Sequence, residues 1–196
     1  MYRKQVKLQK LLCFALLIIS AMIFIYSLGI MTDLYDALYT TIRNPAKPEK
    51  TTVTGSRIYY DMQGFNQQFL LASIGMILLC VTLFLTGTHT RRKYYIGNYA
   101  STLLVSAGGL AFTVWAHGEI EAWKAQFLQI DFEELAAHAA KKKTLHTDST
   151  FWFDIHWVLF GLLVIGIVLL IANVIWKRRL MKGEQMLLAG KKEAVA

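Results

Sequence analysis

Two histidines, His117 and His156, are the residues whose type and position could support chemistry in this 196-residue chain. His117 ends one long apolar block and His156 begins the next, so an antiparallel pair of helices would bring them to the same level. Neutral imidazole is a common ligand of metal ions and of haem iron. The pair therefore predicts a candidate cofactor site for electron transfer, with the acidic residues Glu119, Asp148 and Asp154 nearby in sequence.

The competing interpretation is that both histidines are polar residues of a membrane interface, beside Trp115 and Trp157. No H-x-x-H or H-x-x-x-H spacing occurs, and His138 and His146 lie in or beside a stretch rich in Ala and Lys. We therefore expect no resident cofactor and no metal, and we keep the histidine pair as the alternative.

Other chemistry has less support in the sequence. It contains no G-x-S-x-G, phosphate-binding glycine loop or H-E-x-x-H pattern, so we expect a protein that is not an enzyme. Mid-membrane ionisable residues, which mark transport paths, are missing from the apolar blocks. The polar residues in the interior of these blocks are few, namely Ser20, Ser73, Thr82, Ser106, Thr113 and Asn173.

The elements that must position the histidines are four apolar blocks. Apolar residues make up 55% of the chain and its mean hydropathy is +0.40, an excess that gathers in runs long enough to cross a bilayer. The predicted fold is an all-α integral membrane protein, a four-helix bundle whose spans are residues 11–31, 69–88, 99–117 and 152–176.

Charge predicts the orientation of this bundle. The segments 1–10, 89–98 and 177–196 hold 13 of the 21 Lys and Arg residues and 2 of the 13 acidic residues, which gives +11 on one side and −3 on the other. Because Lys and Arg flank spans on the cytoplasmic side, we expect both termini in the cytoplasm of a plasma-membrane protein. The basic residues Arg91, Arg92 and Lys93 are expected to contact lipid head groups, and this placement argues against nucleic acid as a partner.

The two segments between spans on the outer side are long. Residues 32–68 begin with a helical continuation of the first span, and the β-branched and aromatic run TTVTGSRIYYDM predicts an extended piece. Residues 118–151 carry apolar residues at helical spacing. That helix could lie on the membrane, pack on the first outer segment, or continue the third span outward. Cys13 and Cys80 lie in apolar blocks and are expected to be buried thiols.

The predicted function is that of an accessory or scaffolding subunit of a larger membrane assembly. We expect its partners to be other integral membrane proteins or a second copy, together with membrane lipids. A small-residue patch on the third span lets another helix approach closely. A small self-associating channel is a further alternative. The residues expected to contact a partner are Tyr59, Tyr60, Phe65, Trp123, Phe127 and Phe132 outside the membrane and Gly108 and Gly109 within it.

Overall fold

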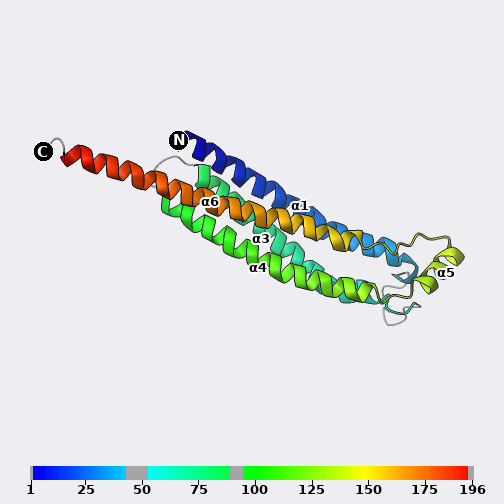
Figure 1. The fold of residues 1–196 in the computed structure, drawn as a ribbon. Coiled ribbons are helices and arrows are strands. Elements are labelled where there is room, and N and C mark those ends of the chain that lie inside the picture. The colour runs from blue at the N-terminus through cyan, green and yellow to red at the C-terminus, as the bar shows by residue number, and fades with distance from the viewer. Residues whose placement is uncertain (1, 43–52, 89–94, 194–196) are drawn as a thin grey trace. The chain divides into compact units, whose positions relative to one another are not determined.

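The computed structural model describes residues 2–42, 53–88 and 95–193, and these residues form helices joined by turns and loops (Figure 1). The helices are α1 (Tyr2–Ile42), α2 (Ile58–Asp61), α3 (Gln63–Thr88), α4 (Tyr95–Phe127), α5 (Phe132–Lys142) and α6 (Phe151–Glu193). Helices α1, α3, α4 and α6 are long and apolar enough to cross a membrane. The all-α class and the four candidate spans are therefore confirmed, whereas insertion and orientation stay predictions.

The long helices extend beyond the predicted apolar blocks. Helix α1 has 41 residues and includes the predicted continuation of the first span. Helix α6 has 43 residues, so most of the tail predicted to follow residue 176 prolongs the fourth helix. A helix end need not coincide with a membrane surface, and the predicted span boundaries stay predictions.

The chain forms two compact units, each of which contains a segment of all four long helices. The first unit comprises residues 1–20, 76–110 and 161–196, and the second comprises residues 21–75 and 111–160. In the first unit, a Cβ atom on Gly109 would lie 2.7 Å from Ile167 Cδ1, and one on Gly166 would lie 2.7 Å from Leu16 Cδ2. The small residues thus let apolar side chains of neighbouring helices pack closely.

A buried polar cluster also lies in the first unit. Gln5 donates to Gln9 over 3.0 Å, and both Gln9 Nε2 (3.0 Å) and Lys177 Nζ (3.2 Å) donate to Asn98 Oδ1. These bonds connect α1, α4 and α6 and satisfy the amide of Gln9 and the amide oxygen of Asn98, which would otherwise be costly among apolar side chains. The two cysteines of this unit are buried free thiols, as predicted.

Aromatic side chains form the core of the second unit. Phe69 is fully buried, and its ring centroid lies 5.7 Å from Tyr26, 5.6 Å from Phe65 and 5.7 Å from Phe112. Such pairs contribute about 0.5–1.5 kcal/mol each beyond the area they bury. Because they come from α1, α3 and α4, this core fixes those helix segments against one another.

The prediction of an extended piece before the second span is wrong for residues 53–61; residues 51 and 52 lie outside the described residues. Residues 53–57 form turns, with Gly55 at a φ of 81°, and α2 follows. Ser56 Oγ donates to the Val53 carbonyl over 2.7 Å, and Tyr60 N donates to the Arg57 carbonyl over 2.9 Å. These local hydrogen bonds outweigh the β propensity of the sequence.

The second outer segment contains two helical stretches rather than one. Helix α4 continues the third span to Phe127, and α5 begins after Asp131, whose carboxylate accepts a 2.9 Å hydrogen bond from Glu134 N. Asp131 N also donates to the Thr54 carbonyl over 3.3 Å. Two of the three arrangements left open by the sequence thus occur together within the chain: the helix of the third predicted span continues beyond residue 117, and the segment after it contacts residues 53–57.

Candidate metal-binding site

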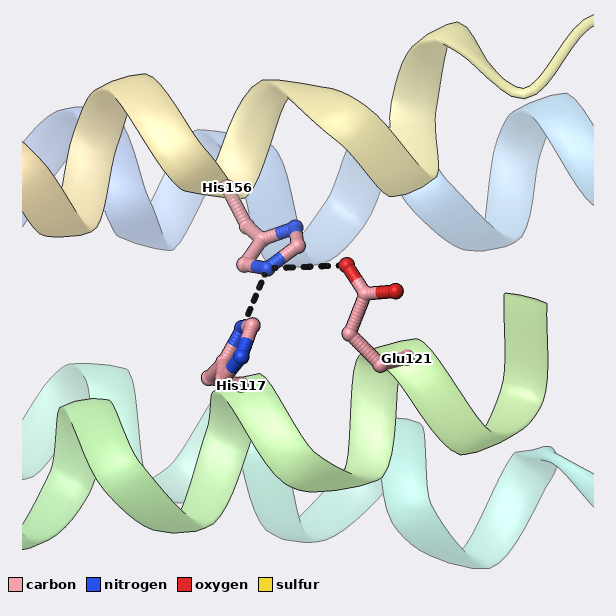
Figure 2. A group of neighbouring side chains, drawn as sticks. All are labelled: His117, Glu121 and His156. Atoms are coloured by element: carbon pink, nitrogen blue, oxygen red, sulfur yellow. Dashed lines mark hydrogen bonds and ion pairs between the residues drawn. The ribbon is translucent and has the colours of Figure 1, made fainter. Parts of the chain in front are cut away.

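His117, Glu121 and His156 form a cluster in the second unit (Figure 2). His117 Nδ1 lies 2.8 Å from His156 Nε2, and Glu121 Oε1 lies 3.6 Å from the same His156 nitrogen. One ligand atom from each of the three residues lies within 4.8 Å of those of the other two. Two imidazoles and a carboxylate are thus grouped closely enough to be candidates for holding one ion.

The local sequence explains why these side chains meet. His117 and Glu121 are four residues apart on α4 and therefore share one helix face. The apolar residues Ile120 and Phe127 are fully buried and hold α4 in the unit. On the other side, Ser149 Oγ accepts a 3.2 Å hydrogen bond from Phe151 N at the start of α6, which sets His156 in the second turn.

His156 is fully buried and has a defined orientation. Its Nδ1 contacts the carbonyl oxygen of Phe153, and because a carbonyl only accepts, this nitrogen carries the proton. In the neutral ring, Nε2 then carries no proton and accepts the hydrogen bond from His117 Nδ1. A metal-binding histidine commonly has this arrangement, in which one nitrogen donates to a carbonyl and the other offers its lone pair to the ion.

Further contacts hold α4 and α6 together around the cluster. Trp157 Nε1 donates to Glu121 Oε1 over 3.0 Å. Lys124 pairs with Asp154, which also accepts a 2.7 Å hydrogen bond from Thr150 Oγ1. Lys124 is therefore engaged by Asp154, while Glu121 faces the histidines.

The distances fit a small ion better than haem. Two ligands about 2.05 Å from a tetrahedral zinc ion lie about 3.3 Å apart. The 3.6 Å between His156 and Glu121 is close to this value, and the 2.8 Å between the two histidines requires a ring movement of about 0.5 Å. Trans ligands of a haem iron would lie roughly 4 Å apart with a macrocycle between them, so haem would require the rings to separate further.

The structure brings together the two histidines that the sequence paired. Among the acidic residues, the one that lies beside the histidines is Glu121, which was not predicted from the sequence, rather than Glu119, Asp148 or Asp154. A usable signal was present, since His117 and Glu121 have the i, i+4 spacing that places two ligands on one helix face. The expectation of no metal stays a prediction, and this cluster is the place at which it can be tested.

Some of the residues predicted to contact a partner are buried within the chain. Phe65 is 6% exposed and stacks on Phe69, and Phe127 is fully buried against Phe132 and Phe153. Gly109 is buried against Ile167. Contacts within the chain thus occupy Phe65, Phe127 and Gly109, and their predicted contact with a partner stays untested.

The other predicted partner residues are partly accessible. Tyr59 and Tyr60 lie on α2 with ring centroids 5.4 Å apart, and Trp123 and Phe132 are half-buried. Gly108 is half-buried beside Leu79. The predicted lipid-contacting residues Arg91, Arg92 and Lys93 lie outside the described residues.

Comparison with models of known protein families, with curated proteins and with solved structures finds no match.

Proposed function

We propose that this chain is a multi-pass membrane protein that binds a divalent transition-metal ion, with zinc as the best fit, through His117, Glu121 and His156. The observation that carries the proposal is the convergence of three ligand atoms within 4.8 Å on a buried histidine whose second nitrogen is held by a backbone carbonyl. Two imidazoles and one carboxylate suit zinc, and a water molecule would complete a tetrahedral shell.

In the proposed topology, both termini are cytoplasmic and the metal site lies near the outer surface of the plasma membrane. The excess of Lys and Arg in segments 1–10, 89–98 and 177–196 supports this orientation. Ions would then reach the site from the extracytoplasmic side, since Glu121 is 37% exposed while His156 is fully buried.

A second candidate function, compatible with the first, is that of a non-enzymatic accessory subunit. Leu128 is 56% exposed and Leu145 is 84% exposed, and both lie in the segment predicted to be outside the membrane. Exposed apolar residues beyond the lipid favour contact with another protein. Purification in mild detergent tests this role: a stoichiometric membrane partner is expected, and a homogeneous lone chain would contradict it.

Zinc titration of the detergent-solubilised protein against a chromophoric chelator tests metal binding. We expect one zinc per chain, with loss of about 100-fold or more in affinity for His156→Ala, because each ligand of a structural zinc site contributes about 3–4 kcal/mol. His138→Ala removes a histidine from α5 and serves as the matched control. Equal zinc affinity in the two variants would refute the site.

A further inference from the structure

A groove in the first unit lies between α1 and α6. Its volume is about 190 Å³, and its lining is almost entirely apolar. The lining residues are Leu8, Leu12, Leu169, Ala172, Asn173 and Trp176. In a membrane-spanning chain, such a groove is wide enough for part of a hydrocarbon chain.

Asn173 gives the groove a polar feature. Its side chain is 2% exposed, and neither its amide nitrogen nor its amide oxygen has a hydrogen-bond partner. An unpartnered amide among apolar groups costs several kcal/mol in hydrocarbon, so a ligand that bonds to it gains affinity. The ester carbonyl of a phospholipid is an acceptor for the amide nitrogen, and it lies directly next to the acyl chain that would fill the groove.

Basic residues flank one end of the groove. Lys4 precedes Leu8 by one helical turn on α1, and Arg179 follows Trp176 by one turn on α6, so both lie on the faces that line the groove. Both are exposed. The sequence contains no acidic residue in segments 1–20, 76–110 and 161–183, which make up most of this unit. This end of the groove therefore suits an anionic head group.

We propose that the groove binds one anionic phospholipid. An acyl chain lies along the leucines, the amide nitrogen of Asn173 donates to an ester carbonyl, and the phosphate lies between Lys4 and Arg179. The six helical steps from Asn173 to Arg179 span about 9 Å, a length that a lipid's ester-to-phosphate segment and an extended arginine can bridge together. This inference depends on membrane insertion and is independent of the metal site.

Trp176 reports on this groove because it is the only tryptophan in the first unit. The protein is reconstituted in phosphatidylcholine vesicles that contain increasing fractions of a lipid with brominated acyl chains, which quench the fluorescence of nearby indoles. In one series the brominated lipid is phosphatidylglycerol, and in the other it is phosphatidylcholine. The contribution of Trp176 is the difference between the wild type and Trp176→Phe. We expect half-maximal quenching of that contribution at a roughly tenfold lower fraction of the brominated phosphatidylglycerol.

Matched variants separate a built site from diffuse charge attraction. Lys4→Gln with Arg179→Gln is expected to abolish the preference for phosphatidylglycerol. Arg3→Gln with Arg178→Gln removes the same number of positive charges one residue away on each helix and is expected to retain the preference. Asn173→Leu is expected to weaken it. Equal quenching by both lipids, equal effects of the two paired variants, or an unchanged preference in Asn173→Leu would overturn the proposal. If the protein were dimeric and neither brominated lipid quenched Trp176, the groove would instead be covered by a second copy of the chain.

Discussion

Replacing Gly29 by Ala tests the close approach of α1 and α6 in the second unit. A methyl carbon at Gly29 would lie 2.3 Å from Cζ3, 2.6 Å from Cη2 and 2.8 Å from Cε3 of Trp152. The indole has little freedom to move, because it stacks on Tyr26 with 6.5 Å between ring centroids and contacts Phe151 at 5.5 Å. Overpacking of this kind costs about 1–3 kcal/mol, and the higher helix propensity of Ala offsets up to about 1 kcal/mol of it.

We therefore expect Gly29→Ala to destabilise the protein by about 1–2 kcal/mol, which corresponds to a melting temperature about 2–8 °C lower in a chain of this size. Thermal unfolding in detergent measures the change. Gly75→Ala is the control, because a Cβ there meets nothing within 4 Å, and it should leave the melting temperature unchanged or slightly higher.

The clash also predicts non-additivity. Trp152→Phe removes the outer part of the indole, so Gly29→Ala should cost less than half as much in that background. If Gly29→Ala were as stable as Gly75→Ala, or equally costly with Phe at position 152, the close approach described for these helices would be refuted.

Three further predictions concern the metal site and the outer segment. Glu121→Gln keeps an acceptor for Trp157 but removes the charged ligand, so zinc affinity should fall roughly 100-fold, while Glu119→Gln, which removes a charge outside the cluster, should leave it unchanged in the same titration. Zinc affinity in the wild type should fall as the pH is lowered, since protons compete with zinc for imidazole nitrogens, and an affinity independent of pH would exclude histidine ligation. Gly55→Ala should lower the melting temperature by the equivalent of about 1–3 kcal/mol, because Gly55 has a φ of 81° and its Cβ would lie 3.1 Å from the Cα of Ile130; an unchanged melting temperature would contradict this geometry.

The four long helices could be predicted from the sequence because each contains an apolar block long enough to cross a bilayer, a signal independent of tertiary packing. The ends of these helices could not, since polar residues such as those of α1 beyond residue 31 continue the helix. The strand prediction failed near Gly55, where short-range hydrogen bonds and a positive φ form turns before α2.

Part of the candidate site was also predictable. His117 and His156 follow from antiparallel helices that share one level, and the structure places their nitrogens 2.8 Å apart. Glu121 could have been found from its spacing to His117. The role of the Phe153 carbonyl in orienting His156, and the unpartnered amide of Asn173 beside a groove, depend on packing between helices that no local sequence pattern specifies.

The most direct test of metal binding is the zinc K-edge X-ray absorption spectrum of the purified protein loaded with one equivalent of zinc. The account predicts a first shell of nitrogen and oxygen at about 2.0–2.1 Å with the outer-shell scattering of two imidazoles, lost in the variant that combines His117→Ala and His156→Ala. A spectrum without imidazole scattering, or one that is the same in the double variant, would contradict the proposed site.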